Sequence, residues 1–500
     1  MYSRCFVFQN RMPEAAAQSA ESDPLSVDPE PPKKSKYDRA IVEGPLGRAV
    51  WKIAWPTVLT NMIGGLQGLV DHALVGHFVG IKGNAAIGVS IQLWIAVIVF
   101  ISSIFIGMSV MVSRFVGAGD EEKVNRAVYQ AFLTAIIMSF GILAPVGYFA
   151  APYLLDFVHA APDVKAEALP FLRIMYAFSG GMLIFFMLGG ALRSAGDART
   201  PMILGIVMTV LNLVLNLILI PGLGPIPAFG TTGAAMGTTI ASGSIAIYAL
   251  YKLISGGWVV HFPKGGSYAP DWGVIKKLFK LGLPAGIQGI AMNVGGVLML
   301  FFIGSLVQSE AAQAIYSISY GQLFSLVTWT SVGLMGASAA VVGQNIGAGK
   351  PDRANQAVGV AARFGLMGAA FLGFFYFFFP QQLLAAFSVT DPVAVEMGVQ
   401  LLRVLAFSGL FITVALTYTG GLQGSGDTKS PLYISIISQV VVPLSICFVI
   451  RLVSTLEPIH IWFAIFAGHI TRAVLSVLRF GQGKWRSIVV NIEHSEAPSR

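Results

Sequence analysis

Long apolar stretches recur along almost the whole chain, and they restrict its fold more than any other feature. A helix needs about 20 largely apolar residues to cross a membrane. Glycine and proline interrupt many of the stretches, which membrane helices tolerate when neighbouring helices satisfy the freed backbone groups. We therefore predict an all-α integral membrane protein with twelve transmembrane helices. The predicted spans are residues 51–78, 85–112, 126–149, 166–191, 200–220, 231–253, 278–307, 312–341, 356–379, 394–422, 430–452 and 459–480.

The shortage of charged residues excludes a soluble fold. Charged residues make up only 11% of the chain, and hydrophobic residues make up 55%. A soluble chain carries about 25% charged residues, so this chain has too few to cover several globular surfaces. A soluble enzyme, a nucleic-acid-binding protein and a secreted scaffold are excluded. We expect no enzymatic activity, no cofactor and no nucleic-acid partner.

The positions of lysine and arginine predict the orientation. Of the 32 basic residues, 27 lie in the two tails, in the loops after helices 2, 4, 6, 8 and 10, or at the adjoining helix ends, and none lies in the middle of a span. Cytoplasmic loops carry such an excess of positive charge. Both termini are therefore expected in the cytoplasm, with the chain in the cell (inner) membrane. The five basic residues expected on the opposite side of the membrane are Lys82, Lys165, Arg173, Arg403 and Arg451.

Two motifs recur at one offset. SRFVGAGDEEKVNRAV (113–128) and GQNIGAGKPDRANQAV (343–358) are 230 residues apart, as are ALRSAGDARTP (191–201) and GLQGSGDTKSP (421–431). The chain is therefore expected to consist of two homologous six-helix lobes. Because six is even, both lobes have the same orientation, and a pseudo-two-fold axis along the membrane normal should relate them. Transporters built in this way place their sites between repeats.

The repeat and the span pattern divide the chain into five segments. Residues 1–45 are expected to form a disordered cytoplasmic tail because they are polar and proline-rich. Residues 46–256 form the N-lobe with helices 1–6, and 257–271 form a cytoplasmic linker. Residues 272–481 form the C-lobe with helices 7–12, and 482–500 form a cytoplasmic C-terminal tail.

The repeated motifs resemble those of the multidrug and toxic compound extrusion (MATE) family. The resemblance rests on the GAGD and GAGK loops, the LRSAGDARTP and LQGSGDTKSP turns, VDHALVG in helix 1 and LNLVLN in helix 5. The lack of acids in GIQGIAMNVGGVLML of helix 7 and LFITVALTYTGG of helix 10, both in the C-lobe, is most similar to the DinF-like branch. The resemblance implies an efflux antiporter that alternates its access and exchanges small organic compounds, often cationic and amphipathic, for protons or sodium ions. We expect a monomer in the lipid bilayer.

Asp71 is the one acidic residue that lies inside a predicted span and away from its ends. A carboxylate at the bilayer centre costs about 2.5–3.5 kcal/mol, so such a residue marks an ion or substrate path. Pro56 aligns with Pro284 at an offset of 228, which sets Asp71 opposite the apolar Met299. Ion coupling is therefore predicted in the N-lobe only. A protonated acid that merely binds a neighbouring helix is the alternative.

Helices 5 and 6 offer partners for Asp71. Asn212 and Asn216 are four residues apart, so their amides share one helical face. Thr238 corresponds to a hydroxyl that the family resemblance places near the site. The group Asp71, Asn212, Asn216 and Thr238 is predicted to carry the coupling ion, either a proton or sodium, and no other metal is expected. Ordinary hydrogen bonding between helices remains the alternative for the amides and the hydroxyl.

Helix 1 is predicted to move during transport. Pro56 removes a backbone hydrogen bond and should bend the helix. Gly64 and Gly68 form a GxxxG face that should let another helix approach closely. We hypothesise that protonation of Asp71 frees helix 1 to bend at Pro56 and expel bound substrate. His72 follows Asp71 directly, but successive helical residues point about 100° apart, so a structural role is favoured.

The substrate pocket and the cargo are the least constrained features. Phe185 and Phe186 of helix 4 are expected near a roomy apolar pocket, together with Tyr176, Phe178, Met187, Met292 and Asn293. The alternative function is a flippase for lipid-linked oligosaccharide or a peptidoglycan precursor. Such a protein usually holds pyrophosphate in a basic cavity, whereas no mid-span cation is expected here. No phosphate-binding GxxxxGK[ST] loop is present, so the energy source should be an ion gradient.

Overall fold

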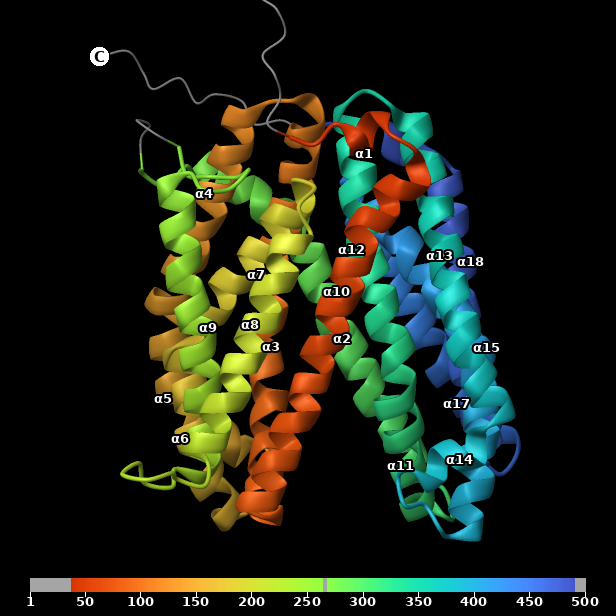
Figure 1. The fold of residues 1–500 in the computed structure, drawn as a ribbon. Helices are drawn as coiled ribbons and strands as arrows, with labels where there is room; N and C mark the ends of the chain where they lie inside the picture. The colour runs from red at the N-terminus through yellow and green to blue at the C-terminus, as the bar shows by residue number, and fades with distance from the viewer. Residues whose placement is uncertain (1–36, 264–267, 491–500) are drawn as a thin grey trace, which may run out of the picture. The chain divides into compact units, whose positions relative to one another are not determined.

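The computed structural model describes residues 37–263 and 268–490, and helices are the only regular structure in these ranges (Figure 1). Nine helices of this part are long and apolar enough to cross a membrane. A tenth span consists of α6 and α7, which bend by 52° at their junction. The remaining two spans are α2 and α3. Each of the twelve predicted spans thus coincides with a single or interrupted helix, and ten of these have the length and hydropathy of a membrane span.

The N-lobe contains six spans, of which the third is interrupted by a π-helical turn. Its helices are α2 (Leu46–Phe78), α3 (Ile81–Ala118), α4 (Glu121–Met138) continued by η1 (Ser139–Leu143) and α5 (Ala144–Phe157), α6 (Pro162–Ala177) with α7 (Ser179–Ser194), α8 (Arg199–Leu219) and α9 (Gly230–Ser255).

The C-lobe repeats this order, and two of its spans contain π-helical turns. Its helices are α10 (Trp272–Gly304), α11 (Ser309–Tyr316) continued by η2 (Ser317–Leu323) and α12 (Phe324–Gly347), α13 (Pro351–Phe378) with the short α14 (Pro380–Ala385), α15 (Pro392–Ser425), α16 (Lys429–Ile436) continued by η3 (Ile437–Val441) and α17 (Val442–Val453), and α18 (Pro458–Gly481).

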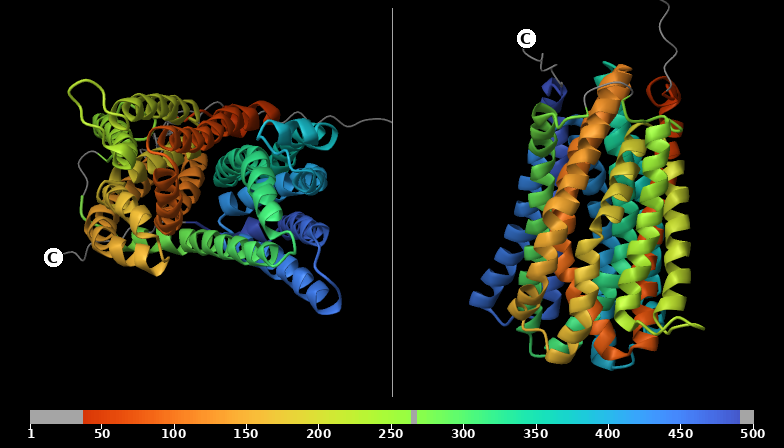
Figure 2. Two further views of the ribbon diagram at one scale, coloured as in Figure 1. Left: turned by 90° about the horizontal axis from the view of Figure 1, so that it is seen from below. Right: turned by 90° about the vertical axis from the view of Figure 1, so that its left-hand side faces the viewer.

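The contact between the lobes is reciprocal, as a pseudo-two-fold axis requires. α2 packs on α12, and its counterpart α10 packs on α3 (Figure 2). A Cβ atom at Gly117 would lie 2.0 Å from the Gln344 carbonyl oxygen, and one at Gly347 would lie 2.0 Å from the Arg114 carbonyl oxygen. These two glycines occupy equivalent positions of the repeat. Only residues without a side chain allow α3 and α12 to cross this closely.

Equivalent turns also adopt the same structure in both lobes. Gly196 and Gly426 have φ angles of 98° and 93°, a region that favours glycine. The Asp197 carboxylate accepts the Thr200 backbone N–H at 3.0 Å, and the Asp427 carboxylate accepts the Ser430 N–H at 3.1 Å. Each aspartate thus caps the helix that follows.

The last residues of the predicted disordered tail, 1–45, are ordered in the structure. Residues 1–36 lie outside the described ranges, but Ala40–Glu43 form the short helix α1, and the Ile41 side chain is fully buried. The Lys350 Nζ donates to the Val42 carbonyl oxygen at 3.2 Å. The apolar character of Ile41 and Val42 explains this docking, which the polar average of the tail conceals.

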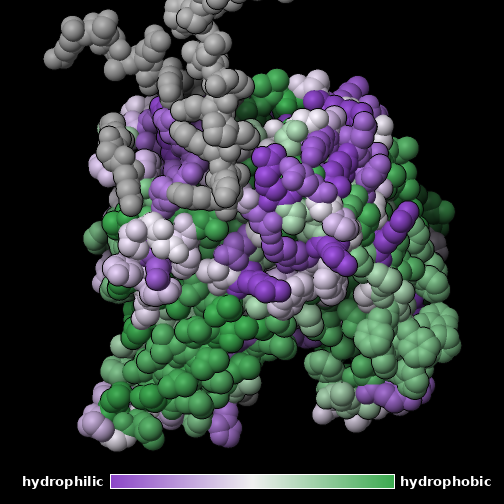
Figure 3. Space-filling model, turned by 45° about the horizontal axis from the view of Figure 1, so that its top comes forward, coloured by the Kyte–Doolittle hydropathy of each residue, from purple (hydrophilic) through white to green (hydrophobic). Residues whose placement is uncertain are grey.

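Polar side chains gather at the end of the described part that carries α1, and apolar side chains cover its flanks (Figure 3). Farther from this end, the two lobes separate and leave a hollow between them (Figure 3). This arrangement places an apolar belt where lipid would lie and leaves the interior faces of the lobes accessible from the opposite end.

Candidate ion-coupling and substrate site

A cavity of about 660 Å³ lies in the N-lobe and includes Asp71 in its wall. This volume is in the range of about 300–1,000 Å³ that holds small organic ligands. α2, α3, α6, α7, α8 and α9 line the cavity, and α12 adds one residue from the C-lobe. The large apolar side chains of the wall are Trp94, Phe171, Met175, Met182, Phe185, Phe186, Met208 and Trp329.

The structure brings the four predicted coupling residues together in one hydrogen-bonded chain. The Asn216 Nδ2 donates to Asp71 Oδ1 at 2.8 Å and to Asn212 Oδ1 at 3.3 Å. The Asn212 Nδ2 donates to the Thr238 hydroxyl at 3.1 Å. Both asparagines are almost fully buried, whereas Asp71 is half-buried against the cavity. The carboxyl group therefore meets protein dipoles on one side and the cavity on the other.

The Asn212 amide fits its surroundings in two orientations. When the amide is turned, its Nδ2 donates to Asp71 Oδ1 at 3.1 Å, and its Oδ1 accepts from the Thr238 hydroxyl and backbone N–H at 3.1 and 3.2 Å. In the first orientation the amide oxygen faces Asp71 instead. A neutral carboxyl group needs an acceptor and a carboxylate needs a donor. In the turned orientation the amide is a second donor to Asp71 beside Asn216, which favours the ionised carboxyl group.

A glycine makes the approach of α8 to α9 possible. A Cβ atom at Gly237 would lie only 2.1 Å from Asn216 Oδ1. This buried oxygen accepts no hydrogen bond from the described residues. Hard cations prefer oxygen ligands, and Asp71, Asn216 and Thr238 supply carboxylate, amide and hydroxyl oxygens. The donor set therefore fits either a proton on Asp71 or a sodium ion beside it.

The predicted GxxxG contact of helix 1 is wrong. A Cβ atom at Gly64 or Gly68 would meet nothing within 4 Å, and both residues line the cavity. The close approach occurs at Gly65, whose Cβ would lie 2.4 Å from the indole ring of Trp329. At this position of α2, the C-lobe makes its contact through a single large ring. Pro56 is buried within the same continuous helix.

The predicted substrate-pocket residues lie elsewhere, whereas the neighbouring Phe185 and Phe186 do line the cavity. The rotation of each helix about its axis, which the sequence left open, decides this outcome. Tyr176 donates to the Leu93 carbonyl oxygen, Phe178 is 60% exposed, Met187 is fully buried in the core, Met292 contacts Arg472, and Asn293 donates to the Gly289 carbonyl oxygen of its own helix.

Several residues around the site escaped prediction. Gln67 lines the cavity one turn before Asp71 and accepts from the Thr209 hydroxyl at 2.9 Å. Its spacing of four residues from Asp71 is the signal that would have found it. His72 contacts Asn84 at 2.5 Å rather than Asp71, which fits the structural role favoured above.

The expectation that no cation lies in the middle of a span is wrong for Arg472, and a second arginine near a helix end also faces the lobe interior. Arg193, near the end of α7, lines the Asp71 cavity, and its guanidinium group lies 5.8 Å from the centre of the Phe105 ring. Arg472 is 1% exposed within α18. Both residues were assigned to cytoplasmic helix ends, because Arg193 follows the predicted span 166–191 and Arg472 lies in the second half of the span 459–480.

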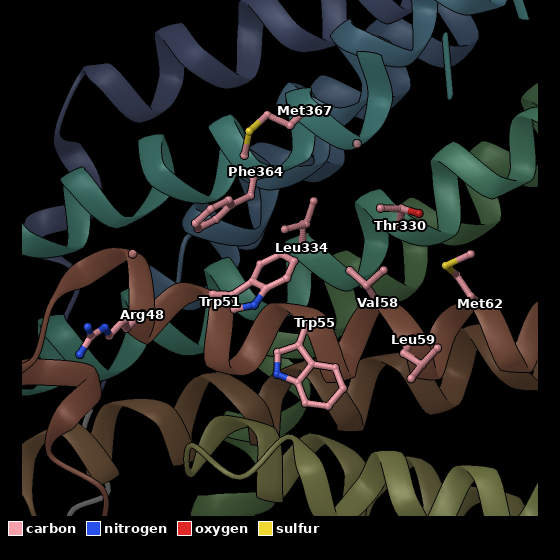
Figure 4. Close-up of a pocket in the computed structure, with 12 residues that line it drawn as sticks. Arg48, Trp51, Trp55, Val58, Leu59, Met62, Thr330, Leu334, Phe364 and Met367 are labelled. Atoms are coloured by element: carbon pink, nitrogen blue, oxygen red, sulfur yellow. The ribbon is translucent and has the colours of Figure 1, made fainter. Parts of the chain in front are cut away.

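A second cavity of about 730 Å³ lies between α2, α12 and α13 (Figure 4). Trp51, Trp55 and Phe364 contribute rings to its wall, and Arg48 stands at one end (Figure 4). The wall contains no acidic residue. This cavity therefore lacks a group that could bind a proton or a cation, and the Asp71 cavity is the candidate site.

Two repeated six-helix lobes, with a buried acid facing a cavity in one of them, define a membrane transporter of the two-lobed class. The MatE family model matches residues 56–218 and 284–449, which begin 228 residues apart at equivalent prolines. The matched segments cover more than half of the chain. The chain therefore belongs to the multidrug and toxic compound extrusion (MATE) family, whose members are transporters and not enzymes.

Individual relatives agree with this assignment. The chain is 26% identical to the probable multidrug resistance protein NorM of Thermotoga maritima, over 88% of this chain and 93% of the relative. It is 24% identical to the multidrug resistance protein MdtK of Pectobacterium atrosepticum, over 86% and 94%. A MATE family transporter solved in an outward-facing conformation is similar in fold, with a TM-score of 0.82 at 20% identity, over 89% of this chain and 97% of that structure.

Proposed function

We propose that this transporter exports organic compounds in exchange for a proton or sodium ion that binds at Asp71. The observation that carries the proposal is the 2.8 Å hydrogen bond from Asn216 to a carboxyl group in the wall of a large, mostly apolar cavity. The cavity supplies room for an amphipathic compound, and the carboxyl group supplies a negative charge. Relatives named as multidrug resistance proteins support export of such compounds.

Coupling follows from competition for one negative charge. An ionised Asp71 attracts a cationic compound into the cavity and favours hydration of the site. A proton or sodium ion removes that charge, so the two states of the site bind cargo with different affinity, which is what shifts a conformational equilibrium. We propose that neutralisation lets α2 bend at Pro56 and contract the cavity. Cargo then leaves toward the side where the lobes separate.

The positive-inside rule supports both termini in the cytoplasm. The α1 end then faces the cytoplasm, and the hollow between the lobes opens to the outside (Figure 3). A bound compound would thus leave outward as an ion enters, which is the direction that export requires.

Dye export from proteoliposomes under separately imposed proton and sodium gradients tests the proposal. Asp71→Asn should abolish gradient-driven export while the protein stays folded. Asp156→Asn is the matched control, because Asp156 forms an exposed ion pair with Lys165 at the opposite end of the lobe from α1. Full export by Asp71→Asn would refute the coupling role. Translocation of a lipid headgroup without dye export would favour the flippase instead.

A further inference from the structure

The C-lobe buries a cation that has no counter-charge. Arg472 is 1% exposed, and its Nε–H donates to no partner among the described residues. The only contact of its Nη2 is the Met292 sulfur at 4.0 Å. No carboxylate of the described residues lies within 4.0 Å of the guanidinium group. Two acids of the lobe pair with other arginines, Asp427 with Arg479 at 2.8 Å and Asp352 with Arg486 at 2.9 Å.

The position of Arg472 makes this isolation costly. Arg472 lies about 21 Å along α18 from Pro458 at 1.5 Å per residue, which places it within the hydrocarbon thickness of about 30 Å. Arginine remains protonated in proteins, so it cannot escape the cost by losing its charge. Buried charges in membrane proteins are paired, and they mark pathways and binding sites. A negative partner from outside the chain would resolve the imbalance.

A second unpartnered group lies beside Arg472. His469 precedes it by three residues, so both side chains share one face of α18. His469 is 1% exposed, and its Nδ1 has no hydrogen-bond partner in the described part of the chain. Two buried side chains on one face thus offer unsatisfied nitrogen atoms. Such groups are expensive to leave unsatisfied, which points to a ligand with acceptor oxygens or a halide.

Aromatic rings complete the surroundings. The Tyr320 ring stacks on His469 with 6.3 Å between centres and 6° between planes, and the Tyr316 ring stacks on Tyr320 at 5.0 Å and 8°. Tyr320 lies in the π-helical turn η2, a feature that is frequent at functional sites. Tyr316, Tyr320 and Met292 are only partly buried. The cluster is thus within reach of a solute at the surface of the lobe.

We propose that Arg472, with His469 and Tyr320, forms a binding site for an anionic group, of which a carboxylate on an aromatic compound is the best match. The planar guanidinium group binds carboxylates through two parallel hydrogen bonds, and the tyrosine rings offer faces for an aromatic body. The inference that such a compound is transported rests on the proposed export function. The inference that it binds at Arg472 does not, so binding is measured without any ion gradient.

The test compares 2-naphthoate with its neutral isostere 2-naphthamide by equilibrium dialysis against the full-length protein in an uncharged detergent. The wild-type protein should bind 2-naphthoate at least tenfold more tightly. Arg472→Met should remove this preference, and Arg472→Lys should keep part of it. Arg451→Gln is the control for net charge, because Arg451 is exposed near the end of α17 in the same lobe.

Each result decides the proposal. Equal affinity of the wild-type protein for the two compounds would overturn it, whether or not Arg472→Met folds. Equal loss of the preference in Arg451→Gln and Arg472→Met would overturn it as well, because surface charge would then explain the binding. If chloride raises the melting temperature of the wild-type protein but not of Arg472→Met, and also competes with 2-naphthoate, the site is upheld and is assigned to free inorganic anions. A naphthoate preference insensitive to chloride would assign it to organic carboxylates.

Discussion

Replacing Gly237 by alanine tests the geometry of the coupling site most directly. The added Cβ atom would lie 2.1 Å from Asn216 Oδ1, whereas ordinary contacts begin at 3.4 Å. One group must therefore move by more than 1 Å, which breaks the 2.8 Å bond from Asn216 to Asp71. Hydrogen bonds between membrane helices are worth about 0.6 kcal/mol on average and at most about 1.7. Overpacking costs about 1–3 kcal/mol, so overpacking dominates the expected loss.

We expect Gly237→Ala to lose about 1–3 kcal/mol of stability and at least tenfold in gradient-driven dye export, since about 1.4 kcal/mol corresponds to a factor of ten. Thermal melting and export from proteoliposomes measure the two effects. Gly243→Ala, six residues later on α9, is the matched control because a Cβ atom there would meet nothing within 4 Å. If both variants melt and transport alike, the contact between α8 and α9 does not position Asp71, and the reasoning fails.

Three further substitutions probe the interfaces around the site. Asp271 caps α10; burial alone would raise its pKa, but the N–H groups of the first turn and the Arg126 guanidinium lower it. Because the folded pKa lies below the unfolded value, Asp271→Ala should cost about 1 kcal/mol at pH 7, and the difference in melting temperature from wild type should vanish as the pH falls through the folded pKa, below about 4. Gly117→Ala should lower the melting temperature strongly, since its Cβ would lie 2.0 Å from a backbone carbonyl of the other lobe; an unchanged melting temperature would contradict the close crossing. Trp329→Ala should enlarge the cavity and broaden the size range of exported dyes. The loss of stability should be about 1–3 kcal/mol, which is less than for a fully buried tryptophan. An unchanged size limit in dye competition would count against the place of Trp329 in the cavity wall.

The fold could be predicted because its determinants are local in the sequence. An apolar stretch of about 20 residues specifies a span whatever surrounds it, and the 230-residue repeat specifies the pairing of spans between lobes. Reciprocal contacts such as that of Gly117 with Gln344 then follow from the symmetry. The docking of Ile41 was missed, because a two-residue apolar signal is lost in the average of a polar tail.

The proximity of the four residues of the proposed coupling site could be predicted because a charge inside a span is rare, and because a spacing of four residues puts Asn212 and Asn216 on one face. The residues of the cavity wall could not be predicted, because they depend on the rotation of each helix about its axis. Gly64 and Gly68 face open space, while Gly65 between them meets the Trp329 ring. Hydropathy does not report this rotation. Arg472 was missed for a related reason: a cation in the second half of a span is compatible with a snorkelling side chain, and only packing shows that it is buried.

The interiors of the two lobes differ in charge, because among the described residues only the N-lobe cavity contains an acid, and this asymmetry has a testable consequence. Asp71 contributes the negative charge of the N-lobe cavity, and its counterpart Met299 in the C-lobe is apolar and 4% exposed. Arg193 and Arg472 remain positive throughout the cycle. Neutralising Asp71 thus leaves the interior positive, which repels a cation and favours an anion, and charges interact strongly away from bulk water. Asp71→Asn should weaken equilibrium binding of ethidium at least tenfold while leaving binding of 2-naphthoate unchanged or tighter. Parallel loss of both ligands would mean that the substitution disrupts the fold, and unchanged ethidium binding would mean that the carboxylate does not attract cationic cargo.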